Sequence, residues 1–310
     1  MTDMLVVPDG PLQSLPLGIL VTEKPVSAVA KLDGYRGVPW LTKKYAITTL
    51  PSVSSLRALR RFAKASRAKK AFLGIGDPLL NGKQGQNRGV EMADLFSSRG
   101  VANVDVIRNR LMRLPETAEE LTAIGKFLGV GPEALMLRGK ATEKNVKTAD
   151  LSDFRILAFA THALVAGELK GLAEPTLVLT PPATGSEIDD GLLTASEVAQ
   201  LKLNADLVIL SACNTASPDG TPGADALSGL TKAFFYAGSR ALLVSHWPTF
   251  SDAAVSLTTG MVARMAKGVG RSEALRQSML AVMNDNSNPH FAHPIFWAPF
   301  VVVGEGGRAS

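Results

Sequence analysis

The sequence predicts an α/β fold in which a mostly parallel sheet is flanked by helices on both faces. Short apolar runs rich in β-branched residues alternate along the chain with segments of helical periodicity, which is typical of such layered folds. The chain has 310 residues, of which 46% are hydrophobic and 20% are charged, so it can bury a large core. No apolar run approaches the ~18 residues of a membrane span, and the first ten residues do not resemble a secretory signal.

The first half of the chain contains both kinds of segment. Strands are predicted at Leu5–Val7, Ala71–Ile75, Asn103–Ile107 and Ala134–Leu137. Helices are predicted at Ser54–Ala68, Val90–Ser98 and Thr117–Leu128. Acidic residues at the start of the last segment favour a helix start there, because negative charge interacts favourably with the amino end of the helix dipole.

The second half is more regular. Strands are predicted at Phe154–Phe159, Thr176–Leu179, Leu207–Leu210, Ala241–Val244 and Phe300–Val303, and helices at Thr194–Leu201, Ala224–Tyr236, Ala253–Ala266 and Ser272–Met283. Thr194 and Glu197 match a capping box, and Gly238 matches a helix stop. A polar stretch at residues 140–152 indicates a boundary between an N-terminal α/β lobe, residues 1–150, and a second lobe, residues 151–310.

Charge and cysteine usage narrow the function classes. The formal net charge is +5, and the excess gathers on one predicted amphipathic helix and its end, at Arg57, Arg60, Arg61, Lys64, Arg67, Lys69 and Lys70. The basic face has no interleaved aromatics and no zinc-finger spacing. We therefore expect it to face solvent or to bind a protein partner, and not to bind nucleic acid. The one cysteine cannot form an internal disulfide, so a cytoplasmic location is expected.

Two reactive side chains follow predicted strands. His162 comes directly after the strand that ends near Phe159, and Cys213, the only cysteine, follows the strand that ends at Leu210. Because the carboxyl ends of parallel strands meet at one edge of a sheet, both residues are expected at that edge. A free thiol has a pKa near ~8.5, so an imidazole nearby would help it to act as a nucleophile. Either residue alone is more often structural, but a histidine ~50 residues before a cysteine is also the caspase arrangement.

Several ordered stretches resemble the CHAT domain, a bacterial family of caspase- and separase-like cysteine peptidases. They include FATHA (159–163), DGLLTASEVAQLKLNADLVILSACNTA (190–216), SGLTKAFFYAGSRALLVSHWPTFSDAA (228–254) and HPIFWAPFVVVGEG (293–306). Upstream, VVPDGPLQSLPLGIL (6–20), GIGDP (74–78) and LPETAEEL (114–121) are also similar to the family. The resemblance implies a caspase-like sheet with an N-terminal pseudo-caspase-like lobe, and a place behind tetratricopeptide (TPR) helical repeats.

The resemblance also implies roles for particular residues. His162 matches the general acid/base and Cys213 the nucleophile of a Cys-His dyad, and the backbone N–H groups of Ala163 and Cys213 match the oxyanion hole. Ala163 stands where the family commonly has glycine. Asp252 matches an acidic residue that, in separase-like relatives, receives a basic side chain before the cut. Asp252 is also placed to cap the helix expected at Ala253. No metal or organic cofactor is implied.

Three alternatives stay open at this point. The chain is either an active peptidase on a protein substrate, a latent one that an activating partner must order, or a catalytically inactive CHAT-type interaction module. Polar loops at residues 180–191 and 217–223 would flank the cleft and could be ordered by such a partner. His246, next to Trp247, is a second imidazole expected near the active-site edge. His290 and His293 lie three residues apart, which is a weak signal for a metal.

Overall fold

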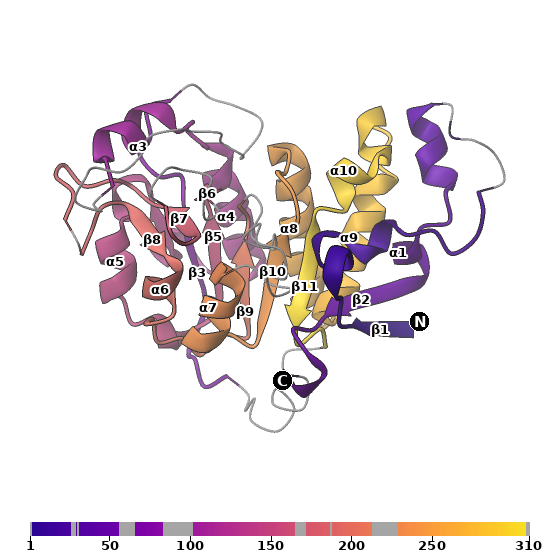
Figure 1. Ribbon diagram of the computed structural model, residues 1–310, viewed down its shortest axis with the longest axis horizontal. Coiled ribbons are helices and arrows are strands. Elements are labelled where there is room, and N and C mark those ends of the chain that lie inside the picture. Colours follow the sequence, from indigo (N-terminus) through magenta and orange to yellow (C-terminus); the bar gives the residue numbers. More distant parts are fainter. Residues whose placement is uncertain are drawn as a thin grey trace.

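The computed structural model describes residues 2–25, 29, 31–55, 66–82, 102–164, 172–186, 188–212 and 229–307. Its main sheet has eight strands (Figure 1). In spatial order they are β1 (Thr2–Val6), β2 (Tyr45–Thr49), β11 (Phe300–Gly304), β10 (Ala241–Ser245), β9 (Leu207–Leu210), β5 (Phe154–Ala160), β3 (Lys70–Gly76) and β4 (Leu135–Leu137). Only the pair β10–β11 is antiparallel among these neighbours. The predicted α/β class with a mostly parallel sheet is confirmed.

Helices cover both faces of this sheet. In the described ranges, the α-helices are α1 (Leu41–Lys44), α3 (Val104–Arg110), α4 (Glu116–Phe127), α5 (Glu143–Thr148), α6 (Ala195–Val198), α7 (Gly229–Ala237), α8 (Ser251–Met265), α9 (Arg271–Met283) and α10 (Pro294–Trp297). The short 3-10 helices are η1 (Gly10–Ser14), η2 (Leu17–Ile19), η3 (Leu32–Gly37), η4 (Pro132–Ala134), η5 (Arg138–Lys140), η6 (Leu151–Asp153) and η7 (Pro289–Ala292). In the described part of the chain, no helix has the length and apolar composition needed to cross a bilayer.

The core lies in two layers because alternate side chains of each strand point to opposite faces. On β5, Ile156 and Ala158 pack in a cluster with α4, α8 and α9, whereas Leu157 and Phe159 pack with α5, α6 and α7. Both faces of the central strands are therefore apolar, which explains why their sequences read as continuous hydrophobic runs.

A second, three-stranded sheet lies beyond the end of β5. It is formed by β6 (Ala163–Leu164), β7 (Thr176–Val178) and β8 (Leu192–Thr194), which pair in that order and are antiparallel. The chain therefore leaves the main sheet at Ala160 and enters the small sheet at Ala163, with His162 between the two. This short link restricts where the backbone on either side of His162 can move.

Local sequence signals set several element ends. The predicted capping box is confirmed, because Thr194 Oγ1 accepts the N–H of Glu197 and the Glu197 carboxylate accepts the N–H of Thr194 at 2.9 Å. Gly238 follows α7 with a φ of +116°, a conformation that side chains rarely adopt, so the predicted helix stop is also confirmed.

In the first half, one predicted strand is wrong and one strand was not predicted. Residues 103–107 are not a strand, because α3 begins at Val104 after Asn103, whose side chain accepts the N–H of Val106. Ile107 and Leu111 are both fully buried, so the apolar spacing that matters is one helical turn. Strand β2 was not predicted, and it joins β1 to β11. The helix expected at 90–98 and most of the one expected at 54–68 lie outside the described residues.

Strands from both predicted lobes share the main sheet. The N-terminal half supplies β1 and β2 at one side and β3 and β4 at the other, and the second half supplies the four strands between them. The division near residue 150 stays a prediction. A boundary there would separate two parts of one sheet rather than two separate sheets.

Candidate active site

His162 lies at the edge of the sheet where β3, β5, β9 and β10 have their carboxyl ends, since these strands are parallel. Strands β5 and β9 are neighbours, with Phe159 opposite Leu210, and the N–H of Ser211 donates to the carbonyl of Phe159 at 2.9 Å. The predicted nucleophile, Cys213, lies outside the described residues, which end here at the buried Ala212. The two strand ends that lead to the predicted dyad are therefore adjacent.

The imidazole of His162 is fully buried and is held by a backbone group. Its Nε2 lies 2.7 Å from the carbonyl oxygen of Met112. A carbonyl oxygen can only accept a hydrogen bond, so we assign the proton to Nε2. In the neutral imidazole Nδ1 is then the basic nitrogen. This tautomer allows Nδ1 to take a proton while Nε2 keeps the ring in place.

The backbone around Ala163 has a defined hydrogen-bond pattern. The N–H of Val178 donates to the carbonyl of His162 at 2.9 Å, and Ala163 lies opposite Leu177 in the antiparallel pair β6–β7. In such a ladder, this bond makes Ala163 and Leu177 a non-hydrogen-bonded pair. The β6–β7 ladder therefore does not use the N–H of Ala163, which points away from β7.

The neighbouring strand β10 carries His246 at its end. The hydroxyl of Ser245 donates to the carbonyl of Ala212, which ties β10 to the residues just before Cys213. The N–H of His246 donates to the carbonyl of Pro299 at 2.9 Å. Burial lowers the pKa of the His246 imidazole to about 4, so this imidazole is neutral near pH 7. It lies close to the strand end, as expected, but its low pKa makes it a weak base.

Asp252 lies in the first turn of α8, which begins at Ser251. Its side chain is exposed, and its Oδ1 accepts the N–H of Ala253 at 2.8 Å. The cap residue is Phe250, so Asp252 stabilises the first turn from inside the helix instead of capping it. Ser251 donates to Oε1 of Glu116 at 2.7 Å. Glu116 is thus a second carboxylate beside the start of α8, and no local sequence signal linked it to Asp252.

The polar loop at residues 180–191 is fastened at its end by one buried carboxylate. Oε2 of Glu143 accepts the N–H groups of Asp190 at 2.8 Å and of Gly191 at 3.0 Å. Lys147 donates to the carbonyl of Ile188 at 2.8 Å and pairs with Glu143 and Glu197. Burial raises the pKa of Glu143 to about 7, and the hydrogen bond from Lys147 opposes that rise. The second predicted loop, residues 217–223, lies outside the described residues.

His290 and His293 have structural contacts. His293 Nδ1 accepts the N–H of Ile295 at the start of α10, and its ring packs edge-on against Tyr35 with centroids 4.8 Å apart. The ring of His290 lies 6.3 Å from that of Phe296. Within the described ranges, no three histidine, cysteine or acidic side chains gather as a metal ion would require.

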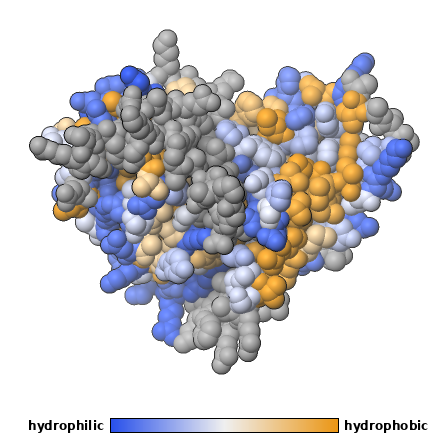
Figure 2. Space-filling model, in the orientation of Figure 1, coloured by the Kyte–Doolittle hydropathy of each residue, from blue (hydrophilic) through white to orange (hydrophobic). Residues whose placement is uncertain are grey.

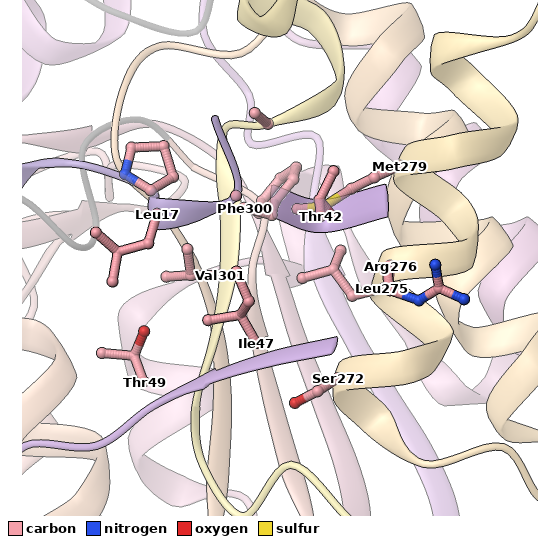
Figure 3. Close-up of a pocket in the computed structure, with 13 residues that line it drawn as sticks. Leu17, Thr42, Ile47, Thr49, Ser272, Leu275, Arg276, Met279, Phe300 and Val301 are labelled. Atoms are coloured by element: carbon pink, nitrogen blue, oxygen red, sulfur yellow. The ribbon is translucent and has the colours of Figure 1, made fainter. Parts of the chain in front are cut away.

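The cavity in Figure 3 is elsewhere in the molecule. It lies between η2, β2, β11 and α9, and its lining includes Leu17, Ile47, Leu275 and Val301. Of the predicted site residues that the structure describes, His162, Ala163 and Asp252, none lines it. Its described walls combine apolar side chains with the hydroxyls of Thr42, Thr49 and Ser272. The position of the candidate site therefore rests on the chemistry at the strand ends and not on this cavity.

Comparisons with known proteins agree with the sequence resemblance. The family model described as "CHAT domain" matches residues 1–305. Tetratricopeptide repeat protein 28 of Homo sapiens is 26% identical over 302 residues, which cover 89% of this chain and 11% of that protein. Its Mus musculus counterpart is 28% identical over 218 residues, which cover 62% of this chain and 8% of that protein. The chain thus matches only a small part of the length of these relatives.

Two solved structures are similar to this chain at low sequence identity, and one of them has a TM-score above 0.5. The crystal structure of the Arg-specific cysteine proteinase gingipain R has a TM-score of 0.52 and 10% identity, with 86% of this chain and 55% of that chain covered. The Saccharomyces cerevisiae separase–securin complex has a TM-score of 0.43 and 12% identity, with 84% of this chain and 14% of that chain covered. The likeness to gingipain R agrees with the caspase-like architecture that the sequence implied.

Proposed function

Because this chain belongs to the CHAT domain family, we propose that it is a cysteine endopeptidase that cleaves a protein substrate with Cys213 and His162. The observation that carries the proposal is the place of His162. It lies at the carboxyl edge of the sheet, fully buried, with Nε2 held by the Met112 carbonyl, and it follows the strand next to the one that leads to Cys213. With the proton on Nε2, Nδ1 is the basic nitrogen of the neutral ring, as the proposed proton transfer requires.

The reaction is an acyl transfer in two halves. The sulfur of Cys213 attacks the carbonyl carbon of the peptide bond, and the thiol proton passes to Nδ1 of His162. The tetrahedral intermediate then loses its C–N bond, and His162 gives the proton to the leaving amine. Water then attacks the thioester while His162 takes a proton from it. The C–S bond breaks, the carboxylic acid leaves, and His162 returns the proton to the sulfur of Cys213.

The negative oxygen of the intermediate needs donors. The N–H of Ala163 is a candidate because the β6–β7 ladder does not use it, and the N–H of Cys213 is the second candidate. One such donor contributes ~2.7–4 kcal/mol to catalysis in well-studied enzymes. Alanine in place of the family's common glycine retains this N–H, so the substitution leaves the proposed donor intact.

Hydrolysis of fluorogenic peptides tests the peptidase proposal. We expect the full chain to release the fluorophore, and the variants Cys213→Ala and His162→Ala to lose at least ~10²-fold in kcat/KM, the typical contribution of acid–base catalysis. The matched control is a substitution of His293, whose side chain caps α10. This variant should retain activity. Activity that survives Cys213→Ala would exclude the proposed nucleophile.

We further propose that Asp252 selects a basic residue before the cut. Its carboxylate is exposed, and its Oδ1 accepts the N–H of Ala253, so Oδ2 can pair with a guanidinium. The neighbouring Glu116 adds negative charge at the start of α8. The structural neighbour gingipain R is an Arg-specific proteinase. For this chain, a preference for a basic residue is part of the proposal.

A peptide panel checks the proposed specificity. We expect the wild type to cleave after Arg in preference to Leu or Glu, and Asp252→Asn to lose ~10-fold or more of that preference, since a charge-assisted pair contributes about 1.5–3 kcal/mol. Asn can still accept the Ala253 N–H, so the first turn of α8 is preserved. Equal preference in the two proteins would exclude Asp252 from the pocket.

The alternative function is an inactive CHAT-type interaction module. The named relatives are tetratricopeptide repeat proteins. We therefore include in the proposal that this chain associates with such repeats and that they activate a latent peptidase. A cytoplasmic location belongs to it as well. The relatives named here are mammalian, so the bacterial origin that the resemblance implied stays a prediction.

A further inference from the structure

The carbonyl that holds His162 belongs to a short segment between two buried leucines. Leu111 and Leu114 are fully buried on either side of Met112 and Arg113. The N–H of Gly82 donates to the carbonyl of Leu111 at 3.1 Å. A Cβ at Gly82 would lie 2.3 Å from that oxygen, so this close approach requires glycine. The segment is thus fixed from one side by residue 82.

Asp77 fixes the same segment from a second side. It follows the end of β3, and its Oδ1 lies 3.6 Å from Nε of Arg113, the residue directly after Met112. Its N–H donates to Thr117 Oγ1 at 2.9 Å, and that hydroxyl donates to the carbonyl of Leu114 at 2.7 Å. Both the side chain and the backbone of Asp77 are therefore connected to residues 113–117.

Asp77 combines a buried carboxylate with a left-handed backbone conformation. Its φ is +43°, which costs a non-glycine residue of order 1–3 kcal/mol and is found most often at functional sites. Only 3% of its surface is exposed. Burial raises the pKa of the Asp77 carboxyl, and the charges of Arg113 and Arg138 oppose that rise.

We propose that Asp77 and Arg113 are positioning residues for His162. Their ion pair holds residues 112–113 in place, so that the Met112 carbonyl stays within hydrogen-bond reach of Nε2 and the imidazole keeps Nδ1 as its basic nitrogen. The proposal rests on the catalytic role given to His162 above. It adds that the tautomer of this histidine is set by a carboxylate 85 positions earlier in the chain, acting through Arg113 and a backbone carbonyl.

Nitrogen NMR of the full chain with 15N-labelled histidine tests this directly. The two ring nitrogens of His162, assigned by loss of their signals in His162→Gln, should show Nε2 protonated and Nδ1 unprotonated at a pH where the ring is neutral. In Asp77→Asn the two shifts should move toward each other as the tautomers mix. Asn keeps the size of the side chain and tolerates a positive φ, so the variant removes the charge with little added strain.

Matched variants separate positioning from general stability. Arg113→Met should reproduce the shift change, and Arg113→Lys, which retains the cation, should restore part of the wild-type spectrum. The control is Asp206→Asn, because Asp206 is equally buried and its Oδ2 pairs with Nε of Arg155 at 3.1 Å, but it lies at the amino end of β9, opposite the site. This control should leave the His162 shifts unchanged.

Activity gives a second readout. If the chain hydrolyses peptides, Asp77→Asn and Arg113→Met should lower kcat by about 10- to 100-fold, as small misplacements of catalytic groups do, with KM changed little. If the chain is inactive, the NMR result still decides the inference. It is overturned if Asp77→Asn and Arg113→Met keep the wild-type His162 shifts, or if the wild type itself is not protonated at Nε2.

Discussion

At the scale of single residues, His246 gives a measurable pH effect. Burial lowers its pKa from 6.5 to about 4 in the folded protein. The unfolded chain therefore binds a proton at this residue below pH ~6.5 while the folded chain does not, and the free energy of unfolding falls as the pH falls from ~6.5 toward 4. The full effect across this range is on the order of 3 kcal/mol.

The variant His246→Leu isolates this contribution. We expect the wild type to lose stability relative to His246→Leu when denaturant midpoints at pH 7 and pH 5 are compared, because the leucine has no proton to bind. A difference between the two proteins that stays constant from pH 7 to pH 5 would contradict the account of a buried neutral imidazole.

The sequence predicted where His162 lies because strands of known direction end at one edge of a sheet. It did not predict Met112, Arg113 or Asp77 as neighbours. Met112 contacts His162 through a backbone carbonyl across 50 residues of sequence, and carbonyls are the same in every residue. Asp77 was visible only as part of a family motif. Its N–H and its carboxylate contact Thr117 and Arg113, which come from another segment.

At the scale of elements, Gly238 shows how one residue fixes the end of a helix. It follows α7 with a φ of +116°, and a Cβ there would lie 2.4 Å from the carbonyl oxygen of Leu203. The N–H of Leu203 in turn donates to the carbonyl of Ala237 at 2.8 Å. This contact joins the end of α7 to the chain entering β9, the strand that leads to Cys213.

Gly238→Ala should therefore destabilise the protein by about 1–3 kcal/mol through backbone strain. The clash of the new Cβ with the carbonyl oxygen of Leu203 adds to this cost. Gly129→Ala is the matched control. Gly129 also has a positive φ, +71°, but nothing lies within 4 Å of a Cβ there, so it should lose less stability. Thermal unfolding measures both variants, and an equal loss in the two would show that the contact with Leu203 does not matter.

Elements buried on both faces of the main sheet were the easiest to predict. Strands β5, β9, β10 and β11 read as apolar runs because helices cover them on both sides. Strand β2 was missed because its burial alternates and polar threonines occupy part of its length. The alternating valines at 104 and 106 predict a strand at 103–107, and they conceal the helical spacing of Ile107 and Leu111.

At the scale of the whole molecule, exposed apolar residues gather near the N-terminal strands and not at the candidate site. Five of the exposed large hydrophobic residues lie within the first 21 positions, namely Leu5, Val7, Leu12, Leu20 and Val21. Figure 2 shows a band of hydrophobic surface on the side of the molecule where β1 and β2 lie in Figure 1. His162 instead follows β5, a central strand of the main sheet, and Asp252 lies in α8.

The shared sheet leads to a prediction about the two lobes. Residues 151–310 alone would lack β3, which pairs with β5 over six register positions from Lys70 to Gly76, and β2, which pairs with β11. Two strands of the isolated half would then expose unpaired edges and apolar faces. We expect this half to be unfolded by circular dichroism when expressed alone, whereas a cooperative thermal transition in it would show that it folds without the first 150 residues.

The most direct test of the central claim is covalent modification of Cys213 by a peptide that carries arginine and a thiol-reactive group. Because the chain has one cysteine, intact mass reports this residue alone. The account predicts a single adduct on the wild type, none on Cys213→Ala, and a rate at least ~10²-fold lower on His162→Ala. Equal rates in the wild type and His162→Ala would contradict the pairing of Cys213 with His162.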